Sequence, residues 1–220
     1  MGARPFTLDA YRALLDAAER GGYRLRGFLG GAPAAGDLLL RHDVDMSLSA
    51  ALAMAELEAE RGVRATYFLM TQSSFYNLHG KPGQRALDRL RELGHEVGYH
   101  AVWPNAAADP HFGFLPVLAW HTPEPHYMAE PVPGWTNVMD PMFTGDFAMT
   151  YRSDSNQHWR RGDPVEDLAA ARFPWLQLLI HPVLWVHDGA TITETMDAFL
   201  DADRAERRRL LLDERIELDG

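Results

Sequence analysis

Two aspartates in a short charged segment are the residues of this 220-residue chain best suited to chemistry. The segment Arg41-His42-Asp43-Val44-Asp45 follows three leucines. If a buried strand ends here, Asp43 and Asp45 lie roughly 6 to 7 Å apart on one face, because alternate strand residues point the same way. Two unpaired carboxylates are costly unless a cation joins them. The pair favours a metal or acid–base site; the competing interpretation is that Asp45 caps the next helix and Asp43 pairs with Arg41 or Arg64.

Three histidines each come at the end of a stretch that we expect to be a strand. They are His100, His121 and His181, and each follows a run of mostly apolar residues. One histidine at a strand end is more often structural than functional. Because the carboxyl ends of parallel strands meet at one edge of a sheet, three of them beside two aspartates predict a shared site there.

The elements that would position these residues alternate along the chain. We expect strands at 23–28, 38–44, 63–70, 96–102, 115–120, 147–152 and 176–180. We expect helices at 7–20, 47–61, 84–93, 164–172 and 191–215. This order of strands and helices predicts an α/β fold with right-handed crossovers. With no linker and no internal repeat, the chain is expected to form one domain over 1–220, a (β/α) barrel of six or seven strands that is distorted or incomplete.

Composition excludes several classes of function. The chain has 31 acidic and 21 basic side chains and a net charge of −10, so it offers no basic surface to nucleic acid or to an anionic membrane. It has no cysteine, so any metal must be held by His, Asp or Glu. No secretory signal is visible and the most apolar run, 173–186, is too short and polar to span a bilayer. We therefore expect a cytoplasmic protein with no nucleic-acid or membrane partner.

Three segments together resemble the polysaccharide deacetylase family, also called NodB-like or carbohydrate esterase family 4. They are 40–45, Ala65-Thr66-Tyr67-Phe68, and Gly94 to His100, within a matching stretch of 38–182. The resemblance implies the distorted (β/α) barrel of that family and a metal-dependent hydrolase. Carried over to this chain, it implies that Asp43 is the general base and that Asp45 and His100 bind the metal. It also implies that His181 is the general acid.

The chain departs from the family pattern at one position. The family usually has a second histidine four residues after the first, and here that residue is Pro104. Catalytic metal sites normally have three protein ligands, so either another residue completes the site or the metal is lost. His121 is the first candidate because it ends a predicted strand, ahead of His111 and His126 in proline-rich stretches. Such a donor set suits Zn²⁺ without excluding Ni²⁺, Co²⁺ or Fe²⁺.

Three further residues are expected to contact a substrate. Asp154 follows the strand expected at 147–152 and would either bind a hydroxyl or orient a catalytic side chain, although turn chemistry also explains an Asp between two serines. Tyr76 would line the mouth of the site or cap a loop. Trp103 would stack on a sugar ring, although partly buried packing is the commoner role of tryptophan.

The function that these inferences predict is hydrolysis of a non-peptide C–N bond by a metal-dependent enzyme. The expected substrate is a carbohydrate or small amide, foremost an N-acetylated sugar or glycan precursor. Two alternatives stay open: hydrolysis of another amide or an ester, and a catalytically silent relative that binds a glycan or a protein. The missing second histidine favours the silent relative, whereas the presence of Asp43, Asp45, His100 and His181 favours the enzyme.

Overall fold

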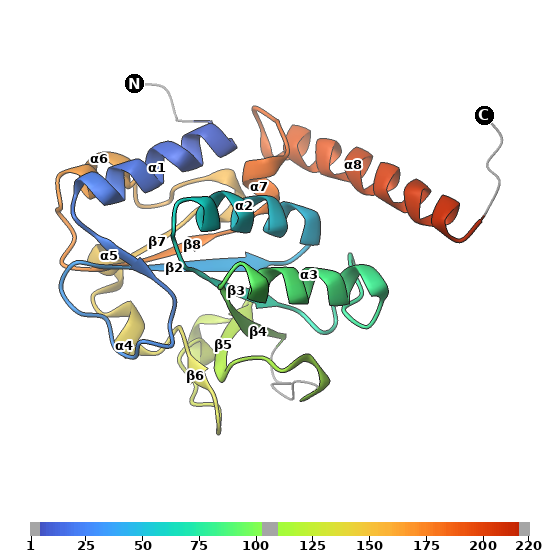
Figure 1. The fold of residues 1–220 in the computed structure, drawn as a ribbon. Coiled ribbons are helices and arrows are strands. Elements are labelled where there is room, and N and C mark those ends of the chain that lie inside the picture. Colours follow the sequence, from blue (N-terminus) through green and yellow to red (C-terminus); the bar gives the residue numbers. More distant parts are fainter. Residues whose placement is uncertain (1–4, 103–109, 216–220) are drawn as a thin grey trace.

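The computed structural model describes residues 5–102 and 110–215, which fold around one curled parallel sheet (Figure 1). The strands are β1 (Arg24–Arg26), β2 (Asp37–Val44), β3 (Thr66–Leu69), β4 (Glu96–Val102), β5 (Val117–His121), β6 (Thr136–Asn137), β7 (Tyr151–Ser153) and β8 (Leu176–Ile180). The α-helices are α1 (Leu8–Arg20), α2 (Leu48–Glu60), α3 (Lys81–Glu92), α4 (Pro141–Thr144), α5 (Phe147–Thr150), α6 (Val165–Ala169), α7 (Val183–Val186) and α8 (Ile192–Asp213). Single 3₁₀ turns form η1 (Pro110–Phe112), η2 (Pro125–Tyr127) and η3 (Ser155–Gln157).

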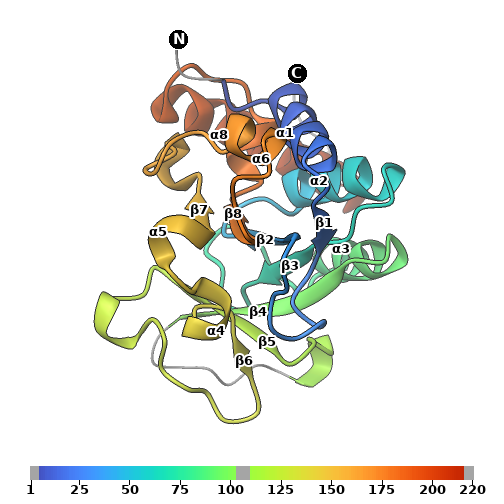
Figure 2. The same cartoon turned by 90° about the vertical axis from the view of Figure 1, so that its left-hand side faces the viewer.

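The sheet is a half-barrel with β2 near its centre. Seven strands run in the order β6-β5-β4-β3-β2-β8-β7, and β1 pairs with the first residues of β2. β3 pairs with the last residues of β2, so β1 and β3 follow one another along the same side of that strand. Figure 2 shows the curl of the strands. Among the residues that the structure describes, no pairing joins β6 to β7. The expected α/β class is confirmed, and the curled sheet is consistent with a distorted barrel.

β2 is buried along its whole length, and its two faces have different environments. Leu38, Leu40 and Val44 belong to the core beneath the helices, whereas Leu39 packs inside the curl. Because side chains alternate along a strand, Asp43 shares the inner face with Leu39, and His42 shares the outer face with Leu40. The adjacent residues His42 and Asp43 therefore place their polar side chains on opposite faces of the sheet.

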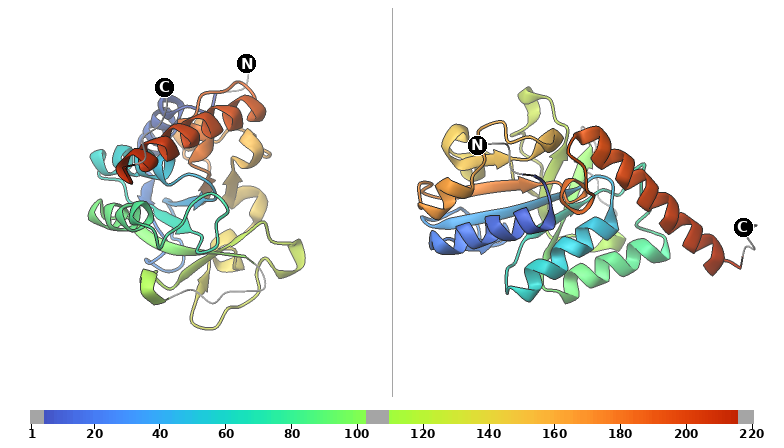
Figure 3. Two further views of the ribbon diagram at one scale, coloured as in Figure 1. Left: turned by 90° about the vertical axis from the view of Figure 1, so that its right-hand side faces the viewer. Right: turned by 90° about the horizontal axis from the view of Figure 1, so that it is seen from above.

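Helices cover the outer face of the sheet. α1 and α2 begin at the caps Thr7 and Ser47, whose hydroxyls accept hydrogen bonds from the backbone N–H groups of Ala10 and Ala50. α2 packs against α3 and α7, and α7 packs against α8. Figure 3 shows α8 extending past the body of the protein. In the described part of the chain, no helix has both the length and the apolar character needed to cross a bilayer.

The expected strand at 147–152 is wrong over its first four residues. Phe147–Thr150 forms the helical turn α5, and the strand β7 begins only at Tyr151. Asp146 caps the turn by accepting from the N–H of Ala148, and the Thr150 hydroxyl donates to the carbonyl of Asp146. These side-chain bonds to the backbone favour a turn over an extended chain. The short elements β6, α4 and α7 were not expected, because runs of two to four residues carry no periodicity.

One carboxylate is enclosed in the outer core, on the opposite side of the sheet from Asp43. Glu58 in α2 has no exposed surface and accepts hydrogen bonds from Tyr67 at 2.8 Å, His42 at 2.7 Å and Tyr11. Burial alone would raise the pKa of Glu58, but the charge of His42 and these hydrogen bonds lower it. This cluster ties α1 and α2 to β2 and β3.

We expect the substitution Glu58→Gln to destabilise the fold by about 2–4 kcal/mol, because it removes the charge that the surrounding donors stabilise. The folded pKa of Glu58 lies below the unfolded one, so its contribution is complete above the unfolded value of about 4.3 and is lost as pH falls below it. Urea unfolding at several pH values between 7 and 3 should therefore show that the free energy of unfolding falls more steeply in the wild type than in the variant. The control is Glu56→Gln, which lies on the same helix as Glu58 but forms an exposed ion pair with Arg89 of α3. It should change the free energy of unfolding by less than about 0.5 kcal/mol. Equal effects of the two substitutions would contradict this account.

Candidate metal centre and active site

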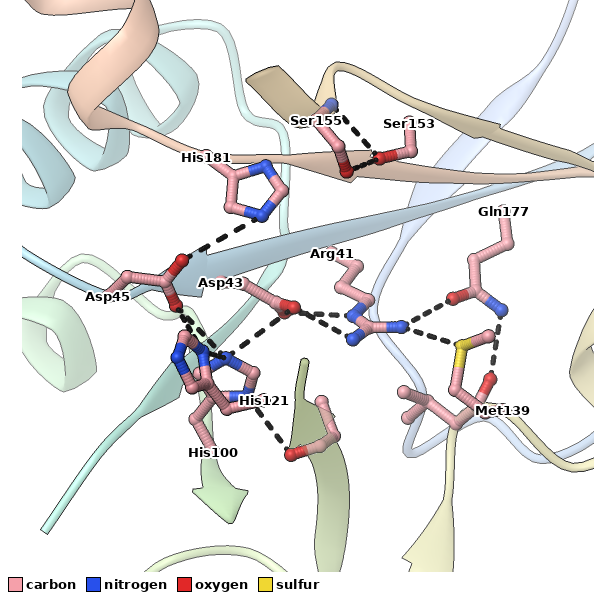
Figure 4. A network of polar contacts seen from close by, with 12 residues as sticks. Arg41, Asp43, Asp45, His100, His121, Met139, Ser153, Ser155, Gln177 and His181 are labelled. Atoms are coloured by element: carbon pink, nitrogen blue, oxygen red, sulfur yellow. Dashed lines mark hydrogen bonds and ion pairs between the residues drawn. The ribbon is translucent and has the colours of Figure 1, made fainter. Parts of the chain in front are cut away.

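Three side chains from separate strands converge at the carboxyl edge of the sheet (Figure 4). Asp45 directly follows β2, His100 lies in β4 and His121 ends β5. One ligand atom from each lies within 4.8 Å of the other two. His100 Nε2 is 3.0 Å from Asp45 Oδ1, and His121 Nδ1 is 3.2 Å from the same oxygen. These three residues could hold a metal ion.

The hydrogen bonds around the two imidazoles show why a cation fits here. His100 Nδ1 donates to the carbonyl of Ala119 at 3.0 Å, so Nε2 of a neutral ring carries a lone pair. That nitrogen faces both Asp45 Oδ1 and His121 Nδ1, which is 3.3 Å away. With a neutral His100, its Nε2 and Asp45 Oδ1 are two acceptors that point at one another, and a proton or a metal ion between them relieves their repulsion. One carboxylate and two imidazoles form a donor set that binds Zn²⁺.

The protonation of this cluster follows from the same contacts. Burial alone would raise the pKa of Asp45, but hydrogen bonds from His100 and His121 hold it well below its usual range. The hydrogen bond to Asp45 raises the pKa of His121. Asp45 is therefore ionised at neutral pH, the state in which a carboxylate binds a metal ion.

Asp45 is free to face this cluster because a different residue caps the following helix. The hydroxyl of Ser47, not Asp45, accepts the capping hydrogen bond from Ala50.

The residue that follows His121 lies in a strained turn. Thr122 adopts a φ of +43°, a conformation that β-branched residues rarely take. Such strain persists where the surrounding structure imposes it.

Asp43 lies beside the cluster and is paired with Arg41. Arg41 Nε donates to Asp43 Oδ1 at 2.8 Å and Nη2 donates to Oδ2 at 2.7 Å, and both side chains are buried. Burial alone would raise the pKa of Asp43, but the charge of Arg41, with the other contacts of the carboxylate, lowers it. Asp43 Oδ2 is also 3.7 Å from His100 Nε2. The pairing with Arg41 considered from sequence is therefore present, and it holds Asp43 beside the His–His–Asp cluster.

His181 faces Asp45 from the end of β8 and is supported from behind by Asp154. His181 Nδ1 donates to Asp154 Oδ1 at 2.6 Å, and its backbone N–H donates to Oδ2 at 2.9 Å. Trp185 Nε1 donates to the same Oδ2 at 2.7 Å. Burial opposes the charged imidazole, but Asp154 raises the pKa of His181 to about 9. Its other nitrogen, Nε2, lies 3.9 Å from Asp45 Oδ2.

These groups line a cavity of about 520 Å³, a size suited to a small ligand. The cavity contains Asp43, Asp45, His100, His121 and His181, which are the five residues predicted for catalysis and metal binding.

Two of the residues expected to bind substrate, Asp154 and Tyr76, are described and are not among those that line this cavity. Asp154 is completely buried beneath His181, so a substrate hydroxyl does not reach it, and of its two expected roles the structure favours orientation of a catalytic side chain. The Tyr76 hydroxyl donates to the carbonyl of Val44 and accepts from the N–H of Met70, which joins the ends of β2 and β3. It does not line this cavity. Trp103 lies outside the described residues.

Two supporting residues were not identified as such from the sequence. Trp185 carries no motif, and only its position one turn after His181 could have suggested a contact with Asp154. Arg41 is a partner of Asp43 that the sequence suggests, but nothing in the sequence indicates that it forms a bidentate pair with the carboxylate. His111 and His126, the weaker candidates for the third ligand, are not part of the described His–Asp cluster.

Comparison with known proteins adds little to this geometry. No family model matches the chain, and no curated protein matches it. Among solved structures, a family 4 carbohydrate esterase from Bacillus anthracis is similar, with 17% sequence identity over 87% of this chain and 85% of that one. The TM-score is 0.30, too low to carry an argument about activity.

The position of Asp154 predicts a measurable effect on His181. In metal-free protein, Asp154→Asn should lower the pKa of the His181 imidazole toward the ordinary value of about 6.5, because the carboxylate that stabilises the charged ring is lost. NMR titration of the histidine ring signals measures this directly. Asp201→Asn, on exposed α8, serves as the control and should leave His181 unchanged. An unaltered His181 pKa in Asp154→Asn would contradict the assignment.

Proposed function

We propose that this protein is a metal-dependent hydrolase that removes an acyl group from the amide nitrogen of a sugar or glycan precursor. The observation that carries the proposal is the content of one cavity: a His–His–Asp cluster, a carboxylate held ionised and an imidazole held protonated. Hydrolysis of an amide needs all three functions, namely activation of water, removal of its proton and protonation of the leaving amine. A fold of the NodB type is part of the same proposal.

Asp45, His100 and His121 would hold the metal ion, and Zn²⁺ suits their donor atoms, with Ni²⁺, Co²⁺ or Fe²⁺ as alternatives. When bound, a divalent ion supplies Lewis acidity that lowers the pKa of water from 15.7 toward about 7 and polarises a carbonyl group. The hydrogen bond from His100 Nδ1 to Ala119 fixes the tautomer that leaves Nε2 ready to coordinate.

Asp43 would accept the proton of the attacking water. Its two contacts with Arg41 keep the carboxylate ionised and fix its orientation beside His100. The same contacts lower its pKa, which makes it a weak base in isolation. It therefore suits a role in which the water has already been acidified, and in which the proton is held only briefly.

His181 would protonate the leaving nitrogen. Its Nδ1 is occupied by Asp154, so Nε2 is the atom that carries the mobile proton into the cavity. A pKa of about 9 keeps the ring protonated at neutral pH, the state that a general acid requires. Arg41 thus lowers the pKa of Asp43, and Asp154 raises the pKa of His181. Opposite shifts of this kind give one site both a base and an acid at the same pH.

The test is release of acetate from N-acetylglucosamine and its short oligomers by zinc-loaded protein. Asp43→Asn should lower kcat by about 10²- to 10⁴-fold while the protein keeps one equivalent of zinc, because it removes a proton acceptor and not a ligand. Asp45→Asn should lose zinc and activity together. Both changes preserve side-chain shape, and circular dichroism checks that each variant folds.

Equal loss of zinc in Asp43→Asn and Asp45→Asn would contradict the division of roles between the two aspartates. Hydrolysis of acetate esters or of other small amides, with no release from N-acetyl sugars, would favour the alternative hydrolase. A zinc-loaded wild type that hydrolyses none of these substrates would favour a protein that only binds glycans or proteins.

A further inference from the structure

Two arginines at the cavity form no ion pair with a carboxylate of the described residues. Arg160 and Arg161 lie between η3 and α6, line the same cavity as the metal cluster and are exposed. Neither forms an ion pair with any residue of the described ranges, in a chain whose net charge is −10. Acidic side chains are abundant in this protein, so two adjacent uncompensated cations facing one cavity need an explanation.

The other cationic side chains of the cavity have partners. Arg41 is engaged by Asp43. Arg152 donates to the carbonyls of Ala148 and Tyr151, and its guanidinium lies 4.9 Å from the centre of the Phe173 ring. Among the described arginines of the cavity, Arg160 and Arg161 are therefore the ones left to meet a ligand.

Arg161 is held against an aromatic wall of the cavity. Its guanidinium carbon lies 4.5 Å from the centre of the Phe147 ring, and Phe147 stacks on Tyr151 with ring centres 4.4 Å apart. Both aromatic residues line the cavity. A guanidinium that stacks on a ring face keeps its N–H edge free, and that edge matches the two oxygens of a carboxylate or phosphate.

The segment that carries the two arginines is anchored at its base. Gln157 donates to the carbonyl of Gly189 at 3.2 Å and accepts from the Thr195 hydroxyl at 3.1 Å. Trp159 packs against the core, and the centre of its ring lies 5.8 Å from that of Phe6 and 6.1 Å from that of Trp185. Arg160 follows this anchor directly, so the backbone that carries it loses little conformational freedom when a ligand binds.

We propose that the substrate carries an anionic group, a carboxylate or a phosphate, and that Arg160 and Arg161 bind it while the amide lies at the His–His–Asp cluster. This inference rests on the proposed function and narrows it to acylated amino sugars with an acidic substituent. The arginines are specificity residues and take no part in the proton transfers.

Binding by chelator-treated protein tests the inference without the metal, which would itself attract a phosphate. Titration calorimetry would compare N-acetylglucosamine with N-acetylglucosamine 6-phosphate and with N-acetylmuramic acid, whose carboxylate is the second anionic probe. At least one anionic ligand should bind about tenfold more tightly than the neutral sugar, the scale of a charge-assisted hydrogen bond, and the preference should shrink as salt rises. The double variant Arg160→Ala/Arg161→Ala should lose the preference and keep its affinity for the neutral sugar. Arg208→Ala, an exposed arginine of α8, should behave as wild type.

Equal affinity of the wild type for neutral and anionic sugars, including no measurable binding of any, would overturn the inference. Retention of the preference in the double variant would also overturn it. Acetate release by zinc-loaded protein is scored separately. Release without a charge preference contradicts only the role of the two arginines, whereas a charge preference without release contradicts the proposed hydrolase.

Discussion

Every buried carboxylate around the end of β2 has to be matched by a cation, and the architecture of the site follows from that constraint. Asp43 is matched by Arg41 from its own strand, and Glu58, on the opposite face of the sheet, accepts hydrogen bonds from His42, Tyr67 and Tyr11. Asp45 faces two imidazoles that arrive from β4 and β5. Ionised groups in such surroundings are tolerated only when paired. The strands bring these partners together from distant parts of the sequence, so the packing of the sheet and the chemistry of its edge depend on each other.

The same constraint separates the properties of groups that lie close together. Arg41 lowers the pKa of Asp43, and Asp154 raises that of His181, although Asp43 is buried and His181 is partly buried in the same cavity. Desolvation alone would push each group toward its neutral form, the carboxyl and the unprotonated imidazole. In each case the contacts of the folded chain, led by this partner, reverse the effect of burial. The pairs Asp43–Arg41 and His181–Asp154 thus allow a base and an acid to coexist at neutral pH. This coexistence supports the proposed hydrolysis.

Sequence was sufficient for the parts of the site that follow strand periodicity. β2, β4 and β8 lie close to where they were expected, and the alternation of side chains placed Asp43 and Asp45 on one face. The expectation that His121 approaches His100 came from the same rule: both lie near the carboxyl ends of their strands, and the register of β4 on β5 sets Val102 beside His121. The α/β class followed from the alternation of apolar strands and amphipathic helices.

The parts that sequence did not predict depend on contacts between distant residues or on local side-chain bonds. Asp154 was assigned a substrate contact as an alternative to orientation, but its burial is decided by Trp185 and His181, far along the chain. Tyr76 uses its hydroxyl to join two strand ends, a contact that no pattern announces. Helix α5 replaced the first four residues of an expected strand because of hydrogen bonds at Asp146. Arg160 and Arg161 lie in a loop, where no periodicity indicates a direction.

The central claim is that Asp45, His100 and His121 bind one metal ion, and anomalous diffraction at the zinc edge from crystals grown with zinc tests it most directly. The account predicts a single strong peak bonded to an Asp45 carboxylate oxygen, His100 Nε2 and His121 Nδ1, at about 2.0 to 2.2 Å from each. The peak should vanish in His121→Ala and persist in His126→Ala, a histidine outside the cluster. A peak that is absent from the wild type, or that lies on other residues, would contradict the account.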